Sequence, residues 1–164
     1  MKRFIAIFSA AAAAGLVTAA FAQEAGSPPP TGWTTQCAST SRGPRPDCSA
    51  AQQIVMSQTQ QLVASITVTV QGETLKPTIL LRIPIGLFIP AGLKLDVDGA
   101  EVMSLELQTC DQTGCYASSL LSDALVNAFR RGETLGLVFQ NLNRDTIRIP
   151  VPLAGFSAAF ERIR

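Results

Sequence analysis

The four cysteines are the residues best suited to do chemistry in this chain, which contains no histidine. They form two closely spaced pairs, Cys37 with Cys48 and Cys110 with Cys115. Pairing between neighbours is the simplest disulfide arrangement, and the two other connectivities that four cysteines allow stay open. The C-x4-C spacing of CDQTGC differs from the C-x-x-C spacing of redox motifs, and oxidised sulfurs do not bind zinc. We therefore expect two structural disulfides and no metal site.

The N-terminus indicates export. Lys2 and Arg3 precede an apolar stretch over residues 4–17, and Ala20-Phe21-Ala22 forms a typical cleavage site. We expect residues 1–22 to be a cleaved signal peptide. The alternative is a retained membrane anchor, which the alanine-rich composition and the cleavage site argue against. The expected location is periplasmic, outer-membrane-associated or secreted, where cysteines oxidise.

Cleavage would leave 142 residues with 11 basic and 12 acidic side chains, because Lys2 and Arg3 are removed with the signal peptide. This near-neutral balance gives no electrostatic reason to expect a nucleic acid as partner. No later apolar run is long enough to span a membrane. Residues 23–32, QEAGSPPPTG, form a flexible linker by composition, so we expect one disulfide-stabilised domain over residues 33–164.

Apolar and polar residues alternate along several segments, which predicts half-buried antiparallel strands in a sandwich or barrel-like all-β domain. The alternating segments lie within residues 61–71, 93–97, 103–107, 135–139 and 147–151. If residues 33–37 also form a strand, Trp33 and Cys37 share one face. The indole would then lie inward, near a 37–48 disulfide.

Two helices are expected beside these strands. Leu121, Leu125 and Phe129 recur every four residues, which predicts a helix of about three turns over residues 119–131. Ser118 and Ser119 are available as its N-cap, and Gly132 is a natural stop. A short C-terminal helix is expected after Gly155.

The Asp98-Gly99 pair predicts a hairpin turn. The apolar residues on both flanks carry odd numbers, so odd-with-odd pairing favours a three-residue loop over residues 97–99, with Gly99 in the left-handed conformation. Asp96 and Asp98 also suggest calcium, but the further oxygens and the glutamate of an EF-hand loop are missing. We therefore expect a plain turn.

Two surface segments are candidates for contact with a partner. The loop STSRGPRPD, residues 39–47, presents Arg42 and Arg45 within the span that a 37–48 disulfide would close. The alternative is a solvated turn whose arginines only aid solubility. Residues 82–93, RIPIGLFIPAGL, predict a strand interrupted by bends, because proline cannot donate to a ladder. We expect Ile85, Leu87, Phe88 and Ile89 to fill the core there, the alternative being an exposed apolar patch.

Several of these motifs occur in one order along the chain: Trp33-x-x-x-Cys37, IPIGLFIPAGLKLDVDG, Cys110-x-x-x-Gly114-Cys115 and PLAGFSAAF. In this order the sequence resembles the invasion-associated locus B family of exported bacterial proteins. The resemblance covers nearly all of residues 33–160. It implies a β-rich periplasmic or surface-associated domain linked with host-cell invasion and virulence, with no catalytic residue and no cofactor.

The residues themselves also argue against an enzyme. Without histidine, nucleophilic catalysis would need a Ser–Lys pair or an acidic dyad, and only Lys76 and Lys94 follow the signal peptide. Two non-enzymatic classes remain. The first is a binding module for an unidentified protein of the envelope or the host. The second is a structural or accessory periplasmic subunit of a membrane or envelope complex.

Overall fold

The computed structural model describes residues 32–38, 46–59, 61–71 and 74–164. The expected signal peptide and all but the last residue of the expected linker lie outside these residues, as do Arg42 and Arg45.

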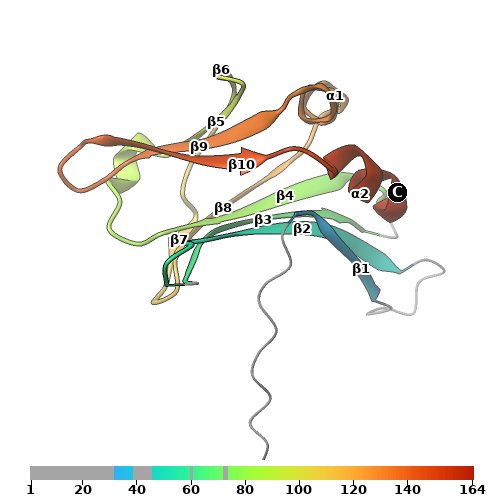
Figure 1. The fold of residues 1–164 in the computed structure, drawn as a ribbon, viewed down its shortest axis with the longest axis horizontal. Coiled ribbons are helices and arrows are strands. Elements are labelled where there is room, and N and C mark those ends of the chain that lie inside the picture. The colour runs from blue at the N-terminus through green and yellow to red at the C-terminus, as the bar shows by residue number, and fades with distance from the viewer. Residues whose placement is uncertain (1–31, 39–45, 60, 72–73) are drawn as a thin grey trace, which may run out of the picture.

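Within these described ranges, ten antiparallel strands form two sheets that face each other (Figure 1). The larger sheet has the order β1-β2-β3-β4-β8-β7. Its strands are β1 (Thr34–Ala38), β2 (Asp47–Val55), β3 (Leu62–Val70), β4 (Pro77–Ile83), β7 (Thr109–Cys110) and β8 (Cys115–Leu120). The smaller sheet has the order β10-β9-β5-β6 and consists of β5 (Leu93–Val97), β6 (Ala100–Leu105), β9 (Thr134–Gln140) and β10 (Thr146–Pro152). The expected β-sandwich is confirmed.

The core lies between the sheets and follows the predicted alternation. In β3, Ile66 and Val68 are fully buried, whereas Thr67 between them is only half-buried. Leu95 of β5 and Leu137 of β9 are also fully buried and lie opposite each other in the register. Each such side chain contributes about 1.5–3 kcal/mol by leaving water.

The first helix, α1 (Asp123–Arg131), begins later than predicted. Ser118 and Ser119 belong to β8, and the N-cap is Ser122, whose hydroxyl accepts the Leu125 N–H at 3.3 Å. Gly132 ends the helix as expected but has an extended backbone, φ −79°. Its role is spatial, because a Cβ there would lie 2.2 Å from Val97 Cγ1.

The second helix, α2 (Phe156–Ile163), follows Gly155 as predicted and packs against β1, β2, β3 and α1. Both helices lie at the same end of the sandwich (Figure 1). Among the described residues, neither helix is long and apolar enough to cross a membrane.

Trp33 contacts α2, which the sequence did not predict. Its ring meets Phe156 edge-on at 5.0 Å between centroids, and its indole Nε1 donates to the Pro152 carbonyl at 3.2 Å. Trp33 is half-buried and packs against the core, as its expected inward placement requires, but its ring contact is with the C-terminal helix, and Cys37 itself is exposed.

The Asp98-Gly99 turn has two residues in its loop, where we expected three. Asp98 and Gly99 both have positive φ, 52° and 88°, and Val97 pairs with Ala100. A β-bulge between Leu95 and Asp96 then shifts the register, so Leu95 pairs with Met103 as the odd-with-odd pattern requires. The pairing prediction was right, and the loop length was wrong because a bulge can correct register after a short turn.

The bent segment between β4 and β5 divides its apolar residues between core and surface. Leu87 is buried and Phe88 half-buried, whereas Ile85 and Ile89 are 58% and 53% exposed. Ile89 begins a short 3-10 helix, η1 (Ile89–Ala91), none of whose residues is buried. The expectation that all four residues fill the core was wrong for these two isoleucines.

Candidate functional site

All four cysteines are paired in the structure, Cys37 with Cys48 and Cys110 with Cys115. Each pair joins residues directly opposite each other on adjacent strands, β1 with β2 and β7 with β8. Both disulfides therefore close hairpins, and neither leaves a thiol for redox chemistry.

The predicted interaction loop with Arg42 and Arg45 lies outside the described residues, but the strands that flank it do not. Ala38 pairs with Asp47, Cys48 with Val70, and Val70 with Pro77. The chain thus leaves β1 and enters β2 at the end of the sheet where β3 passes into β4. A pocket lies at this same end.

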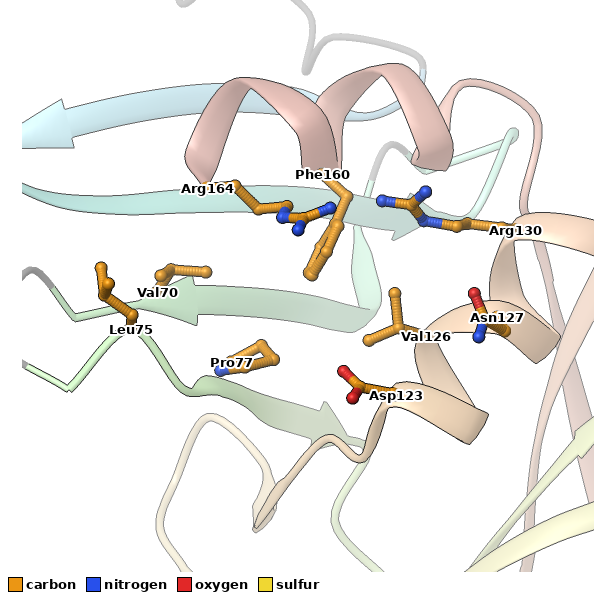
Figure 2. Close-up of a pocket in the computed structure, with 9 residues that line it drawn as sticks. All are labelled: Val70, Leu75, Pro77, Asp123, Val126, Asn127, Arg130, Phe160 and Arg164. Carbon is orange, nitrogen blue, oxygen red and sulfur yellow. The ribbon is translucent and has the colours of Figure 1, made fainter.

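The pocket has a volume of about 430 Å³ and opens between α1, α2 and the β3–β4 connection (Figure 2). This volume is within the range of about 300–1,000 Å³ that ligand sites occupy. Its lining combines apolar and charged side chains: Val70, Leu75, Pro77, Asp123, Val126, Asn127, Arg130, Phe160 and Arg164.

One side of the pocket is formed by α1. Asp123, Val126, Asn127 and Arg130 follow the spacing i, i+3, i+4, i+7, so they form one stripe along α1. Val126 is buried at the base of the stripe, and the three polar residues surround it.

The helix α2 supplies the opposite side through Phe160 and through its C-cap residue, Arg164, one turn further along the chain. Figure 2 shows the guanidinium groups of Arg130 and Arg164 on either side of the Phe160 ring, and Asp123 across the pocket from them. The positive and negative groups are therefore separated within one small cavity.

Glu161 links the two arginines. Its Oε1 accepts from Arg130 Nη2 and lies 3.5 Å from Arg164 Nη1. Arg130 also lies over the Phe160 ring, 5.3 Å from the centroid, a favourable cation–π position. Its side chain is 28% exposed, whereas that of Arg164 is 59% exposed. Arg130 is thus fixed in the wall, and Arg164 stays accessible.

Leu75 stands at the β3–β4 side of the pocket in a conformation that bulky residues rarely adopt. Its φ is +55°, in the left-handed region, and its side chain is 50% exposed. Its N–H donates to the Gln71 carbonyl at 2.9 Å. Strained backbone of this kind concentrates at functional sites, so Leu75 marks the pocket independently of its charges.

A second cavity, of about 250 Å³, involves the predicted bent segment. Met56, Ile85 and Thr113 are among the residues that line it, and Met56 and Ile85 are both exposed apolar side chains. It contains no charged residue. It is the weaker candidate, because its cavity is smaller and its polar side chains, Gln61, Gln112 and Thr113, carry no charge.

The carboxyl groups with shifted pKa values lie outside the pocket, and each shift has a local cause. The pKa of Asp96 is lowered mainly by its hydrogen bonds from Arg148, that of Glu101 by Lys94, and that of Asp111 by Thr113. No group of three or more potential metal ligands occurs among the described residues. These carboxylates act as ion-pair and turn-stabilising groups.

Sequence reasoning did not find the pocket. The sequence predicts the helix that carries Arg130 and the C-terminal helix that carries Phe160, but not that these two side chains share a pocket. The i, i+3, i+4, i+7 stripe of α1 was a readable signal for Asp123 and Asn127. The placement of Val70, Leu75 and Arg164 beside that stripe depends on tertiary packing and had no local signal.

The chain is similar to a known protein family and to a solved structure. Residues 33–164 match the family model described as Invasion associated locus B (IalB) protein. The structure resembles the crystal structure of invasion associated protein B from Bartonella henselae, with a TM-score of 0.71 and 23% sequence identity. That match covers 80% of this chain and 89% of the other, and at this identity it establishes the fold alone. No curated protein matches the chain.

Proposed function

Because the chain belongs to the invasion associated locus B (IalB) family, we propose that it is an exported, non-enzymatic binding module that engages a protein partner of the envelope or the host. The observation that carries the proposal is the pocket between α1, α2 and the β3–β4 connection, where two arginines and an aspartate surround an apolar base. Mixed linings of this kind orient a ligand through polar groups and hold it through apolar contact.

The absence of an enzyme-like arrangement among the described residues supports a binding role. Catalytic sites bring together groups whose pKa values are displaced toward the working pH. Here the shifted carboxyls have lowered pKa values and lie on separate elements: Asp96 on β5, Glu101 on β6 and Asp111 after β7.

Two disulfides and a mature domain preceded by an export signal support a periplasmic or secreted location, since thiols oxidise there. The printed name of the Bartonella henselae relative associates that protein with invasion. For this chain, a contribution to invasion is the most direct extension of a binding role at the cell surface.

Crosslinking in living cells followed by mass spectrometry tests the proposal. A binding module yields the same crosslinked protein repeatedly. Arg164→Gln should reduce the recovery of this protein, whereas Arg162→Gln, which changes an exposed arginine outside the pocket, should not.

The second candidate surface is tested by Arg42→Ala with Arg45→Ala, which should leave the melting temperature nearly unchanged. If only that double variant reduces recovery, the partner contacts the 39–47 loop.

A structural or accessory subunit of an envelope complex is the alternative. It would crosslink to several components of one stable assembly, and recovery would not depend on single pocket residues. Absence of any reproducible crosslinked protein would contradict the binding proposal itself.

A further inference from the structure

The two guanidinium groups of the pocket share one nearby carboxylate, that of Glu161, and the other carboxylate of the pocket, Asp123, lies across from them. Arg130 donates to Glu161, and Arg164 lies 3.5 Å from the same oxygen without a hydrogen bond. A guanidinium has five N–H donors, so most donors of this pair remain for another acceptor. The arginine end of the pocket therefore suits a second carboxylate.

This end is also organised before any ligand arrives. Arg130 is held by Glu161 and by the Phe160 ring, and its Nε is one of two buried side-chain polar atoms without a hydrogen-bond partner among the described residues. An unpaired buried donor is unfavourable, and a ligand that accepts from this guanidinium can offset that cost. Fixed arginine forks favour bidentate contact with a carboxylate.

The other residues that line the pocket restrict which ligands fit. Asp123 lies across the pocket from the guanidinium groups, and Asn127 stands on α1 between Asp123 and Arg130, so that a carboxylate and an amide can accept N–H groups there. Val70, Pro77 and Val126 present apolar surface between these two polar ends, and Leu75 adds an exposed apolar side chain. A ligand that satisfies all three features has a carboxylate, an adjacent apolar side chain and a backbone N–H.

The end of a polypeptide chain carries these three groups in this order. We propose that the pocket binds the C-terminal residues of a partner protein, with the terminal carboxylate on Arg130 and Arg164, the last apolar side chain over Val70 and Pro77, and a backbone N–H toward Asp123. This inference rests on the proposed binding function and specifies its ligand. Capture of a terminal carboxylate is an established mode of peptide recognition, and here two guanidinium groups would supply the donors that backbone N–H groups supply in other sites.

Titration of the purified full-length protein with short peptides tests the inference. The probes are acetyl-Gly-Ala-Leu with a free carboxylate, the same peptide with a C-terminal amide, and acetyl-Glu-Ala-Leu-amide, whose carboxylate is internal. Binding is followed by NMR through the backbone amides of α1 and the Nε–H signal of Arg130. We expect the free acid to bind at least tenfold more tightly than either amide.

The matched variants are Arg164→Gln in the pocket and Arg162→Gln outside it. We expect Arg164→Gln to weaken binding of the free acid at least tenfold and Arg162→Gln to change it less than twofold. Equal binding of the free acid and its amide, or no binding of any probe, would overturn the inference. A partner still crosslinked in cells in that case would leave the proposed binding function standing and exclude only its C-terminal ligand.

Discussion

Arg148 of β10 reaches across β9 to hold Asp96 of β5 at two points. Arg148 Nε donates to Asp96 Oδ2 at 2.8 Å, and Nη2 donates to Oδ1 at 2.6 Å. Asp96 is only 6% exposed and also accepts the Gly99 N–H at 3.0 Å. Gly136 lies between the two strands in the register, opposite both Asp96 and Pro150. The ion pair thus joins three strands and stabilises the edge strand β10.

Gly136→Ala should destabilise the protein by about 2–3 kcal/mol, since it inserts an atom into this ion pair. A Cβ at Gly136 would lie 2.2 Å from Asp96 Oδ2 and 2.5 Å from Arg148 Nε. Urea denaturation measures the effect. Val138→Ala, which removes atoms from the same face of β9, should cost less than about 1 kcal/mol and serves as the control. An equal loss of unfolding free energy in both variants would mean that the Asp96–Arg148 ion pair accommodates the added methyl group.

Asp96→Asn should lower the free energy of unfolding at neutral pH. It should also make this free energy depend less on pH. Arg148 holds the pKa of Asp96 below its ordinary value of 3.8, so the carboxylate stabilises the fold above that pH. This contribution is lost as the pH falls through the lowered pKa of the folded state. The difference between wild type and variant should therefore narrow in strong acid. Denaturation from pH 7 to pH 2 measures it, with Glu106→Gln as an exposed control. If the difference in unfolding free energy between wild type and variant stays constant from pH 7 to pH 2, the ion pair is not the source of that difference.

Trp33→Ala should cost about 2–3 kcal/mol, less than a fully buried tryptophan, because the ring is half-buried. Trp33→Phe should keep most of the edge-on contact with Phe156 and lose only the hydrogen bond to Pro152. Since Trp33 is the only tryptophan, its fluorescence reports this site alone. Emission typical of a fully solvated indole in the folded protein would contradict the packing on α2.

Peptide mapping without reductant should recover the linkages 37–48 and 110–115 and no free thiol. Removing the 37–48 bridge by Cys37→Ala with Cys48→Ala should cost about 3 kcal/mol on chain entropy, and the shorter 110–115 bridge about 2 kcal/mol. Any peptide that joins one pair to the other, or thiols that alkylate without reductant, would show a different connectivity.

The strands that the sequence predicted best are those whose inward residues are large and whose alternate residues are polar, such as β3 and β5. It missed β4 because Leu80, 43% exposed, fills an outward position within the run Ile79-Leu80-Leu81 and hides the alternation. It missed β2 because small residues and the buried Gln52 occupy its inward positions. The alternation of inward and outward residues can be recognised in a sequence only where side-chain size and polarity change together.

The pocket was beyond prediction for a different reason. Its charged residues come from α1 and α2, and its apolar base from β3 and β4, so it exists only once the helices lie over that end of the larger sheet. The cysteines, by contrast, were identified as a site by spacing alone, since each pair lies within one hairpin. Local pairs can be predicted from sequence, whereas sites assembled from distant segments require the packed structure.

Photo-crosslinking from single positions in living cells tests the central claim most directly. A photoreactive residue in place of Asn127, exposed beside the pocket, is compared with one in place of Leu80 on the outer face of the larger sheet. We expect the residue at position 127 to give a discrete protein adduct and the residue at position 80 to give none. Adding Arg164→Gln should reduce the yield of the adduct from position 127 at least fivefold. An adduct from position 80 alone, or no adduct from either position, would contradict a binding site between the two helices.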